Sequence, residues 1–377
     1  MAGLYIHIPF CRQQCYYCDF HFTTSFRQKD RVLAAIKEEI KQRAEEAGVL
    51  DFQSIYIGGG TPSVLTPDEL EDLFSLVYRH YKIDSCAEIT LESNPDDLKK
   101  DFLLSLKSNT PVNRLSVGIQ SFYDRDLRLM NRLHSATHAL QCIEDVKSAG
   151  FDNFTIDLIY GIPGSLNKDW RENLNTLAKF EIPHISAYHL TIEPKTVFAY
   201  YLKKGKIKEV KEDESIRQFQ TLMEFTSYAG YEHYEISNFA KSGYYSKHNL
   251  GYWTQKPYMG FGPSAHSFNG KRRRWNISNN TFYVQSIEKG ASDYFSREDI
   301  DEDKAYNEYI LTSLRTMWGI DLDYLERNFD SKFSALCRQE AEKFIKSGKL
   351  VLTANALCLS NEGKLVADYV ISELMKV

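Results

Sequence analysis

Near its start the chain reads Gly3-Leu4-Tyr5-Ile6-His7-Ile8-Pro9-Phe10, and Cys11, Cys15 and Cys18 follow within the next eight residues. The alternation of apolar with other side chains predicts a short strand that Pro9 ends, so the cysteines lie on the loop at its C-terminal end. A disulfide would use two of these thiols and leave the third over. A metal centre uses all three, because thiolates are the soft ligands of iron–sulfur and zinc sites. The stretch therefore predicts a metal centre.

The number of ligands separates the kinds of metal centre. A closed zinc site needs four protein ligands, and His7 or His21 would have to be the fourth. Three cysteines with one open coordination position suit instead a cluster that binds a further molecule. Three unrelated cysteines in one loop are disfavoured because cysteine is a rare residue.

Length and composition bound the class of protein. A chain of 377 residues exceeds the usual size of one domain, so we expect a large domain and a small one. A net charge of -5 argues against a general nucleic-acid binder, and no run of about eighteen apolar residues is present to span a bilayer. Seven cysteines, an odd number, and the lack of a leader before Leu4 predict a cytoplasmic protein. We expect the four isolated cysteines to be small buried apolar residues; they are Cys86, Cys142, Cys337 and Cys358.

Strand-like and helix-like segments alternate along residues 3–229. Apolar runs predict the strands, and 3.6-residue periods bounded by a cap such as Thr66 or a stop such as Gly48 predict the helices. The expected strands are 3–8, 54–57, 87–91, 114–119, 153–159 and 185–192, and the expected helices are 29–47, 67–81, 97–107, 137–149, 168–179 and 213–229. Six βα units predict an α/β fold with a parallel sheet. Because no glycine-rich dinucleotide fingerprint follows the first strand, we expect a partial (β/α)6 barrel rather than a Rossmann fold.

Polar side chains and glycines gather where these strands end, which is where ligands bind in such a barrel. They are Gly58, Gly59, Gly60 and Thr61 after the second strand, Glu92 and Asn94 after the third, Gln120 and Ser121 after the fourth, Asp157 in the fifth, and His189 and Glu193 after the sixth. Each one alone is equally well explained as loop punctuation. Together they predict one ligand site.

The C-x3-C-x2-C spacing, with the aromatic Tyr17 just before the third cysteine, resembles the signature of the radical S-adenosylmethionine (SAM) superfamily. The resemblance implies a 4Fe-4S cluster on Cys11, Cys15 and Cys18, with Tyr17 beside the cofactor. It also implies that the fourth iron is left free to bind SAM, which an electron from the cluster cleaves to a 5'-deoxyadenosyl radical.

Seven further motifs resemble the branch of this superfamily that contains oxygen-independent coproporphyrinogen III dehydrogenase and the HemW-type heme chaperones. In order they read YIHIPFCRQQCYYCDF, YIGGGTPS, ITLESNP, RLSVGIQSF, MNRLH, IDLIYGIPG and YHLTIEP. By motif position, the SAM site implied is Tyr5, Gly59, Gly60, Thr61, Glu92, Gln120, Arg132 and Asp157. Glycine carbonyls can accept the SAM ammonium, Glu92 can hold ribose hydroxyls, and Arg132 can offset the SAM carboxylate. Arg132 lies in a basic segment that a solvated helix face would also explain.

Two features favour the chaperone branch. The porphyrinogen-oxidising branch has a longer N-terminal extension and a further cysteine two positions after the third, where this chain has Phe20. The H-N-x-x-Y-W motif of the chaperone branch is present as residues 248–253. Imidazole is a standard axial ligand of heme iron, and aromatic rings give a macrocycle apolar contact. The resemblance therefore implies a heme site with His248 as iron ligand and Tyr252 and Trp253 beside it; His266 is a secondary candidate ligand.

The C-terminal part changes in composition. The run Lys271–Trp275 predicts a solvated hairpin, although it would also attract heme propionates or anionic lipid. Helices at 303–317, 322–329, 331–347 and from 361, with a hairpin at 349–359, predict a small winged-helix-like domain. From residue 294 onward, 11 Lys and Arg stand against 15 Asp and Glu, so this domain lacks a nucleic-acid footprint. The expected domains are thus 1–230, 231–293 and 294–377.

The functional expectation is a heme chaperone that binds a 4Fe-4S cluster, SAM and heme and passes heme to respiratory heme proteins. The alternative is the anaerobic radical decarboxylation of coproporphyrinogen III, and a structural zinc protein is the third reading. The resemblance leaves open a peripheral contact with the inner membrane and a homodimer.

Overall fold

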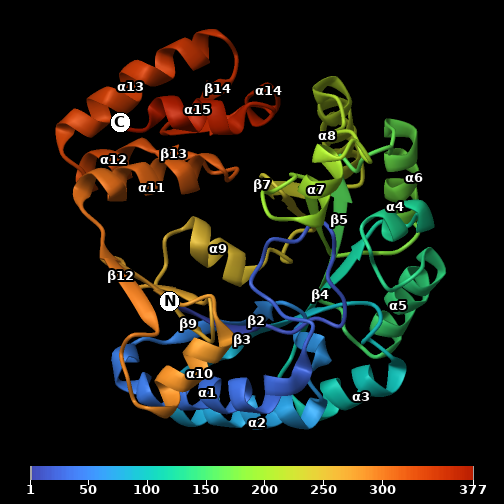
Figure 1. The fold of residues 1–377 in the computed structure, drawn as a ribbon. Coiled ribbons are helices and arrows are strands. Elements are labelled where there is room, and N and C mark those ends of the chain that lie inside the picture. The colour runs from blue at the N-terminus through green and yellow to red at the C-terminus, as the bar shows by residue number, and fades with distance from the viewer. Residues whose placement is uncertain (1, 377) are drawn as a thin grey trace.

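The computed structural model describes residues 2–376, and one large sheet dominates it (Figure 1). Twelve strands follow one another across this sheet in the order β12-β11-β10-β9-β1-β2-β3-β4-β5-β6-β8-β7. The six strands β1 to β6 are parallel neighbours; they are β1 (Ala2–Ile8), β2 (Phe52–Gly59), β3 (Ile83–Ser93), β4 (Arg114–Gln120), β5 (Phe154–Tyr160) and β6 (His184–His189). Each of the six expected strands is present, so the α/β expectation is confirmed.

Helices join the parallel strands and lie along the outside of the curved sheet (Figure 1). They are α1 (Lys29–Gln42), α2 (Pro67–His80), α3 (Lys100–Asn109), α4 (Asp124–Leu129), α5 (Ala136–Ser148), α6 (Asn167–Leu177), α7 (Val197–Lys203) and α8 (Glu212–Tyr228). Thr66 caps α2 as expected, since its hydroxyl accepts the Glu69 N–H and the Glu69 carboxylate accepts the Thr66 N–H. The sequence pattern missed α4 and α7, because each is too short to show a helical period.

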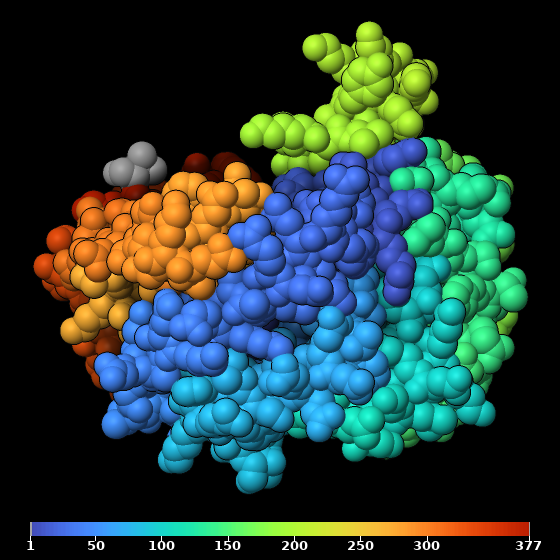
Figure 2. Space-filling view, turned by 60° about the horizontal axis from the view of Figure 1, so that its bottom comes forward, coloured from blue at the N-terminus to red at the C-terminus, as the bar shows by residue number. Residues whose placement is uncertain are grey.

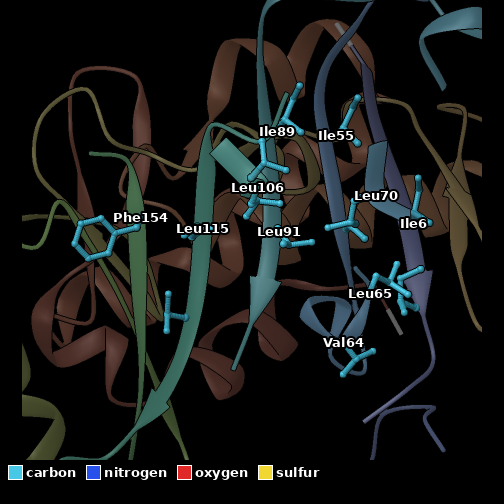
Figure 3. Close-up of a cluster of buried hydrophobic side chains, with 14 of the residues drawn as sticks. Ile6, Ile55, Val64, Leu65, Leu70, Ile89, Leu91, Leu106, Leu115 and Phe154 are labelled. Carbon is cyan, nitrogen blue, oxygen red and sulfur yellow. The ribbon is translucent and has the colours of Figure 1, made fainter. Parts of the chain in front are cut away.

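The main core lies between the sheet and these helices (Figure 3). Ile55 and Leu91 from β2 and β3 are fully buried, as are Leu70 from α2 and Leu106 from α3. Burying a side chain of this size contributes about 2 kcal/mol each, which makes this layer the main stabilising term of the large domain. The six parallel strands do not close into a full barrel. The outer edge of β1 pairs with β9 and the outer edge of β6 pairs with β8, so β1 and β6 do not pair with each other. The barrel is therefore partial, as expected.

Residues after α8 extend the sheet at both ends. Strands β7 (Glu232–Glu235) and β8 (Asn238–Ala240) continue from β6, whereas β9 (Tyr258–Phe261) pairs parallel to β1. The remaining elements of this extension are α9 (Lys247–Trp253), β10 (His266–Phe268), β11 (Arg272–Asn276) and α10 (Asn280–Glu288). These short elements show no periodic pattern in the sequence, and pairing with β1 and β6 decides the strands β9 and β8 among them.

The C-terminal domain has its own core and a three-stranded sheet of order β13-β15-β14. Its elements are α11 (Glu302–Leu314), β13 (Ile320–Asp321), α12 (Leu322–Asn328), α13 (Ser331–Lys346), β14 (Leu350–Leu352), β15 (Ala356–Leu359), α14 (Asn361–Lys364) and α15 (Ala367–Leu374). The mainly helical expectation with a hairpin is confirmed. Strand β12 (Phe295–Asp299) pairs with β11 in the large sheet, so these five residues lie with the extension rather than with the C-terminal domain.

The basic run Lys271–Trp275 belongs to a hairpin, as expected, because β10 and β11 pair antiparallel, and Lys271 and Arg272 are exposed. Most of it forms β11, which has a partner strand on each side. Arg272 pairs with Asp299 at 2.6 Å, Arg273 with Glu308 at 3.0 Å and Arg274 with Glu46 at 3.2 Å. Acidic neighbours that are distant in sequence therefore neutralise this run.

A buried ion pair fastens α1 to the extension. Arg43 donates to the Glu39 carboxylate at 2.9 Å and to the Gly260 carbonyl at 2.7 Å. The same carboxylate accepts the Tyr283 hydroxyl at 2.7 Å and the Asn276 amide at 2.9 Å. Glu39 and Arg43 are both buried, so each charge depends on the other and on these donors.

We expect Glu39→Ala to lower the free energy of unfolding by about 3 to 5 kcal/mol, because it leaves the Arg43 charge with only the half-exposed Glu46 as partner and removes the acceptor of Tyr283 and Asn276. Glu38→Ala, one position earlier, is the matched control. It removes an exposed pair with Lys41 at 3.4 Å and should cost less than about 1 kcal/mol. Urea unfolding followed by tryptophan fluorescence measures both, and equal midpoints for the two variants would remove this network from the stability of the fold.

Candidate functional site

The three clustered cysteines line one cavity of about 450 Å³ at the C-terminal ends of the parallel strands. Their loop leaves β1 and is closed by a bridge between Phe10 and Thr23, with the Cys11 N–H donating to the Thr23 carbonyl at 3.0 Å. All seven cysteines of the chain are free thiols. The loop thus brings three reduced thiols to one cavity, as the sequence predicts.

The arrangement of these thiols separates a cluster from zinc. Within residues 2–376, no group of three or more Cys, His, Asp and Glu side chains is arranged to hold a single metal ion. Zinc needs all its ligands about 2 Å from one centre, whereas a cluster takes its thiolates on different irons. His7 and His21, the alternative fourth ligands, line a neighbouring cavity instead. The donor set therefore fits a 4Fe-4S cluster and not a closed zinc site.

Two donors point at the sulfurs. The Thr61 hydroxyl donates to Cys11 Sγ and Arg132 Nη1 donates to Cys15 Sγ, both at 3.3 Å. Burial raises the pKa of Cys11 to about 11 and that of Cys18 to about 12. A cluster would therefore bind these thiols only with loss of their protons, and the Thr61 hydroxyl would stabilise the Cys11 thiolate.

Arg132 is fixed in this cavity. Its Nη2 donates to the Asn94 side-chain oxygen and to the Gly118 carbonyl, each at 2.6 Å. Its Nε is buried without a partner among the described residues, and so is Oε1 of Gln120 on the same cavity wall. Gln120 also has a φ of 67°, a backbone conformation that is uncommon for residues other than glycine. Two orphaned polar atoms around one cavity fit a polar ligand, and Arg132 does not lie on a solvated helix face.

Two partly buried carboxylates complete the wall. Glu92 accepts the Tyr56 hydroxyl at 2.7 Å and the Gly59 N–H at 3.2 Å, and Asp157 accepts the Ser116 hydroxyl at 3.1 Å. Burial raises the pKa of Glu92, and burial together with the Glu92 charge raises the pKa of Asp157 to about 7. A cationic ligand would favour the ionised form of both, so the pair fits a ligand with positive charge.

The glycines at the end of β2 are required for packing inside the protein, apart from any contact with a ligand. Gly59 has a φ of +114°, and a Cβ there would lie 2.7 Å from the His7 ring. A Cβ on Gly60 would lie 2.8 Å from the Phe10 carbonyl oxygen. Both residues line the cavity, as the sequence predicts, but their small size is also needed to pack β2 against β1 and its loop.

A second cavity of about 890 Å³ lies beside the first. Both cavities are lined by Asp19, Phe20, Gly59 and Glu92, so they share a wall. The second cavity also takes residues from β1, the extension and α11; they include Tyr5, His7, His21, Tyr252, Trp253, Lys256, Tyr258, His266, Phe268, Arg273, Glu308 and Leu311. It is thus an aromatic cavity that three parts of the chain form together.

The H-N-x-x-Y-W motif is not a loop but helix α9, which places His248 and Tyr252 on one face. His248 Nδ1 bonds to the Ser54 hydroxyl at 2.8 Å and Nε2 to the Tyr252 hydroxyl at 2.9 Å. The side chain is buried against the parallel strands, and burial lowers its pKa to about 3. In this conformation neither ring nitrogen is open to a metal.

The other aromatic candidates do reach the second cavity. Tyr252 and Trp253 line it, and so does His266. His266 is exposed, its ring stacks on Trp275 with 6.3 Å between centroids, and none of the described residues hydrogen-bonds to its imidazole. His266 is therefore the cavity histidine whose ring nitrogens are both free.

Comparison with known proteins agrees with this geometry. The Radical SAM superfamily matches residues 5–177, and the HemN C-terminal domain matches residues 300–366. The heme chaperone HemW of Bacillus subtilis is 33% identical over 376 residues, covering 98% of this chain and 98% of that protein. The heme chaperone HemW of Lactococcus lactis is 30% identical over 359 residues, covering 95% and 93%. The chain belongs to the HemW heme chaperone family.

The fold agrees with a solved structure related to the HemW family. Coproporphyrinogen III oxidase (HemN) from Escherichia coli, described as a radical SAM enzyme, superposes with a TM-score of 0.86 at 23% identity, covering 100% of this chain and 90% of that one. At this identity the match shows the fold alone. Membership of the radical SAM superfamily implies a 4Fe-4S cluster and SAM, for which the cysteine cavity supplies the matching donors.

Several residues of this HemW-family site were not found by the sequence analysis, because they do not lie in the loops that follow the strands. Tyr56 and Ser116 hold the carboxylates described above, and Lys256 adds positive charge to the second cavity. Tyr56 and Ser116 lie within strands whose ends the sequence analysis used, so strand alternation is the signal that would have found them. Lys256 has no such signal, because only the β9–β1 pairing brings the segment before β9 to the cavity.

The isolated cysteines follow expectation in part. Cys142 and Cys337 are buried, as predicted, and Cys358 is partly exposed. Cys86 is exposed, because it lies at the start of β3, beyond the region that the helices cover. No helix in the described part of the chain is both long and apolar enough to cross a membrane.

The raised pKa of Asp157 predicts a pH dependence of stability. The unfolded chain releases this proton near pH 3.8 but the folded chain near pH 7, so the free energy of unfolding falls by about 1.4 kcal/mol per pH unit as pH rises through this window. Asp157→Asn removes this pH-dependent loss of stability, because the amide does not titrate. Its stability relative to the unsubstituted protein should therefore be higher at pH 8 than at pH 5, without added SAM.

Urea unfolding at the two pH values measures this difference. Asp152→Asn, at an exposed position, is the matched control. Its stability relative to the unsubstituted protein should be the same at both pH values. An Asp157→Asn effect that does not change with pH would contradict the raised pKa.

Proposed function

We propose that this protein is a heme chaperone that holds a 4Fe-4S cluster and SAM in the cysteine cavity and heme in the adjoining aromatic cavity. The observation that carries the proposal is the shared wall. A thiol-lined cavity with partly buried carboxylates meets a large aromatic cavity at Gly59 and Glu92, and the aromatic cavity holds the free imidazole of His266 and the Lys256 ammonium. Cluster, SAM and heme are then neighbours within one molecule.

The residues of the first cavity match the groups of SAM. Glu92 and Asp157 are carboxylates that suit ribose hydroxyls and a sulfonium charge, and Arg132 suits a carboxylate. The unpaired Gln120 Oε1 can accept from an ammonium group. The remaining contacts proposed for SAM and the cluster are Tyr17, Gly59, Gly60 and Thr61. Tyr5, which the motif resemblance places with SAM, lines the adjoining aromatic cavity. When bound, the cluster supplies one-electron chemistry, while the protein supplies charge matching and burial.

The second cavity suits a heme. Its volume lies in the range of cofactor pockets, which is about 300 to 1,000 Å³. Tyr252, Trp253, Tyr258 and Phe268 offer apolar ring surface to a macrocycle. The Lys256 ammonium forms no ion pair within the described residues, so it is available to a propionate.

The iron ligand that the geometry supports best is His266. Its imidazole is free in the cavity, whereas coordination by His248 would require the Tyr252 hydroxyl to leave Nε2. His248 then acts as a positioning residue that holds Tyr252 against the cavity wall. The motif thus contributes ring surface through Tyr252 and Trp253, and His248 keeps their helix in place.

Delivery of heme fits an open cavity built from three parts of the chain. Its wall includes Glu308 and Leu311 on α11, so movement of the C-terminal domain would change access to it. Together with the family name, this supports transfer of heme to heme-dependent respiratory proteins as the final step. The cytoplasm is the proposed location, with a peripheral membrane contact during transfer.

The cluster assignment is tested by single changes to the cysteines. Replacing Cys11, Cys15 or Cys18 by Ser should abolish cluster assembly, because a hydroxyl is a poor ligand for iron in such clusters. Cys86→Ser, at an exposed thiol outside the cavity, should retain full iron and sulfide content after anaerobic reconstitution. An equal loss in Cys86→Ser would show that the open-iron arrangement is wrong.

The heme assignment is tested by titration followed by absorbance. His266→Ala should lose stoichiometric heme binding or weaken it at least tenfold and change the spectrum, because the iron loses its donor nitrogen. His138→Ala removes a partly exposed imidazole on α5 and should bind heme normally. Trp253→Ala should weaken binding while keeping the spectrum of an imidazole ligand.

Two results would overturn parts of this proposal. If His248→Ala loses the imidazole spectrum and His266→Ala keeps it, His248 is the iron ligand after a local rearrangement. Conversion of coproporphyrinogen III under anaerobic, reducing conditions with SAM would contradict the chaperone function itself.

A further inference from the structure

One ion pair in the wall of the aromatic cavity joins two parts of the chain. Arg273 on β11 and Glu308 on α11 both line this cavity, and Arg273 Nη1 lies 3.0 Å from Glu308 Oε1. Figure 2 shows the orange part of the chain, near residue 300 on the colour bar, at the surface between the blue N-terminal part and the red C-terminal domain. The pair thus connects the sheet extension to the C-terminal domain at the cavity.

The exposure of this pair indicates how firmly it is held. The Arg273 side chain is 33% exposed and the Glu308 side chain is 21% exposed. Glu39 and Arg43, in contrast, form a buried pair whose side chains are 0% and 4% exposed. A partly exposed pair contributes little to stability, because water can replace either partner. Arg273 can therefore exchange Glu308 for another carboxylate at little cost.

Arg273 lies on the same face of its hairpin as His266. In the β10–β11 ladder Arg273 is opposite Phe268. His266 is opposite Trp275, two residues further along the same ladder. Residues two apart on a strand share a face, so the imidazole, the Phe268 ring and the guanidinium are neighbours. Arg273 Cζ lies 5.8 Å from the Phe268 ring centroid, which places flat apolar surface directly beside a carboxylate-binding group.

The cations near the cavity differ in what they bind. Lys256 lines the cavity, and no carboxylate of residues 2–376 pairs with it. Arg272 and Arg274 pair with other carboxylates and lie outside the cavity lining. Arg273 is in the lining, but its partner is a carboxylate of the chain itself. A ligand with two carboxylates therefore meets one open cation and one that is already occupied.

We propose that Arg273 is the second carboxylate-binding residue of the aromatic cavity and that Glu308 occupies it until a carboxylate of the ligand takes its place. The inference rests on the proposed heme site and names the groups that select its ligand. Lys256 holds one propionate, Arg273 holds the other, and the Glu308 carboxylate turns to solvent. One guanidinium–carboxylate pair replaces another, and no covalent bond is made or broken.

This exchange makes Glu308 a specificity-determining residue. A macrocycle with free carboxylates gains a partner at Arg273 that compensates for the pair it breaks. A macrocycle of the same shape without free carboxylates gains none, so the Arg273–Glu308 pair stays in its way. The cavity thus favours the free acid over a neutral derivative.

The test compares heme with heme dimethyl ester, whose two propionates are neutral, by absorbance titration of the full chain at low ionic strength. Glu308→Gln frees Arg273 without removing it, whereas Arg273→Gln removes the guanidinium. Glu302→Gln is the matched control, because Glu302 is exposed on the same helix and lies outside the cavity lining.

We expect Glu308→Gln to bind heme about threefold more tightly than Glu302→Gln, since binding no longer breaks the partly exposed pair. Arg273→Gln should bind heme about tenfold more weakly, because a charge-assisted contact is lost. The affinity for the ester should change less in both variants. The double variant should bind heme like Arg273→Gln alone, because Glu308 then has no guanidinium to release.

A heme affinity of Glu308→Gln equal to or weaker than that of Glu302→Gln would overturn the proposal. An equal gain for heme and for the ester would overturn it as well. Because the supporting result is a gain in affinity, a variant that fails to fold cannot imitate it.

A failure of the heme site is distinguishable from a failure of this exchange. If the unsubstituted protein binds neither heme nor the ester, the heme site itself is wrong, and the selectivity is wrong with it. If it binds both and neither Glu308→Gln nor Arg273→Gln changes the preference between them, the heme site stands and only the carboxylate exchange is wrong.

Discussion

Both cavities depend on the position of β1 in the sheet. This strand is paired on both sides, with Tyr5 opposite Tyr56 of β2 and opposite Gly260 of β9. Its C-terminal end carries the cysteine loop, while Tyr5 and His7 on the strand face the aromatic cavity. Because parallel strands bring their C-terminal ends to one edge, the same pairing gathers Glu92, Gln120 and Asp157 around the thiols. Without β9, the second cavity would lack one wall.

Burial sets the charge state of these groups. The pKa values of Glu92 and Asp157 are raised, and those of His7 and His248 are lowered to about 4 and about 3. Each shift disfavours the charged form, so the site without ligands tends toward neutrality. Ligands that bring their own charge are then favoured, because they restore ionisation to groups that are already oriented.

The H-N-x-x-Y-W motif shows how one stretch can carry a structural and a binding part. His248 is turned inward to Ser54 and the parallel strands, while Tyr252 and Trp253 line the cavity. His248 and Tyr252 lie one helical turn apart on the same face of α9 but reach to different depths. The structural part of the motif is therefore one turn away from the part that lines the cavity. The motif therefore joins the interior of the barrel to the cavity wall.

The sequence by itself determined the cluster loop and the six parallel strands. Local patterns are enough here, because three thiols within eight residues and repeated βα periods need no distant partner to be recognised. Of the residues that the motif resemblance implies for SAM, Tyr5 lines the second cavity and the others line the first. Arg132, which a surface helix would explain equally well, is fixed there only by its bonds to Asn94 and Gly118.

The tertiary structure alone decided the rest. Whether His248 or His266 is open to the second cavity depends on contacts with Ser54 and Trp275, which are distant in sequence. The arginines of β11 are neutralised by Glu46 just after α1, Asp299 of β12 and Glu308 of α11, whereas no carboxylate of residues 2–376 pairs with the exposed lysines of residues 194–208. Composition cannot separate two such basic runs, because the free energy of a charge is set by the groups that folding brings near it.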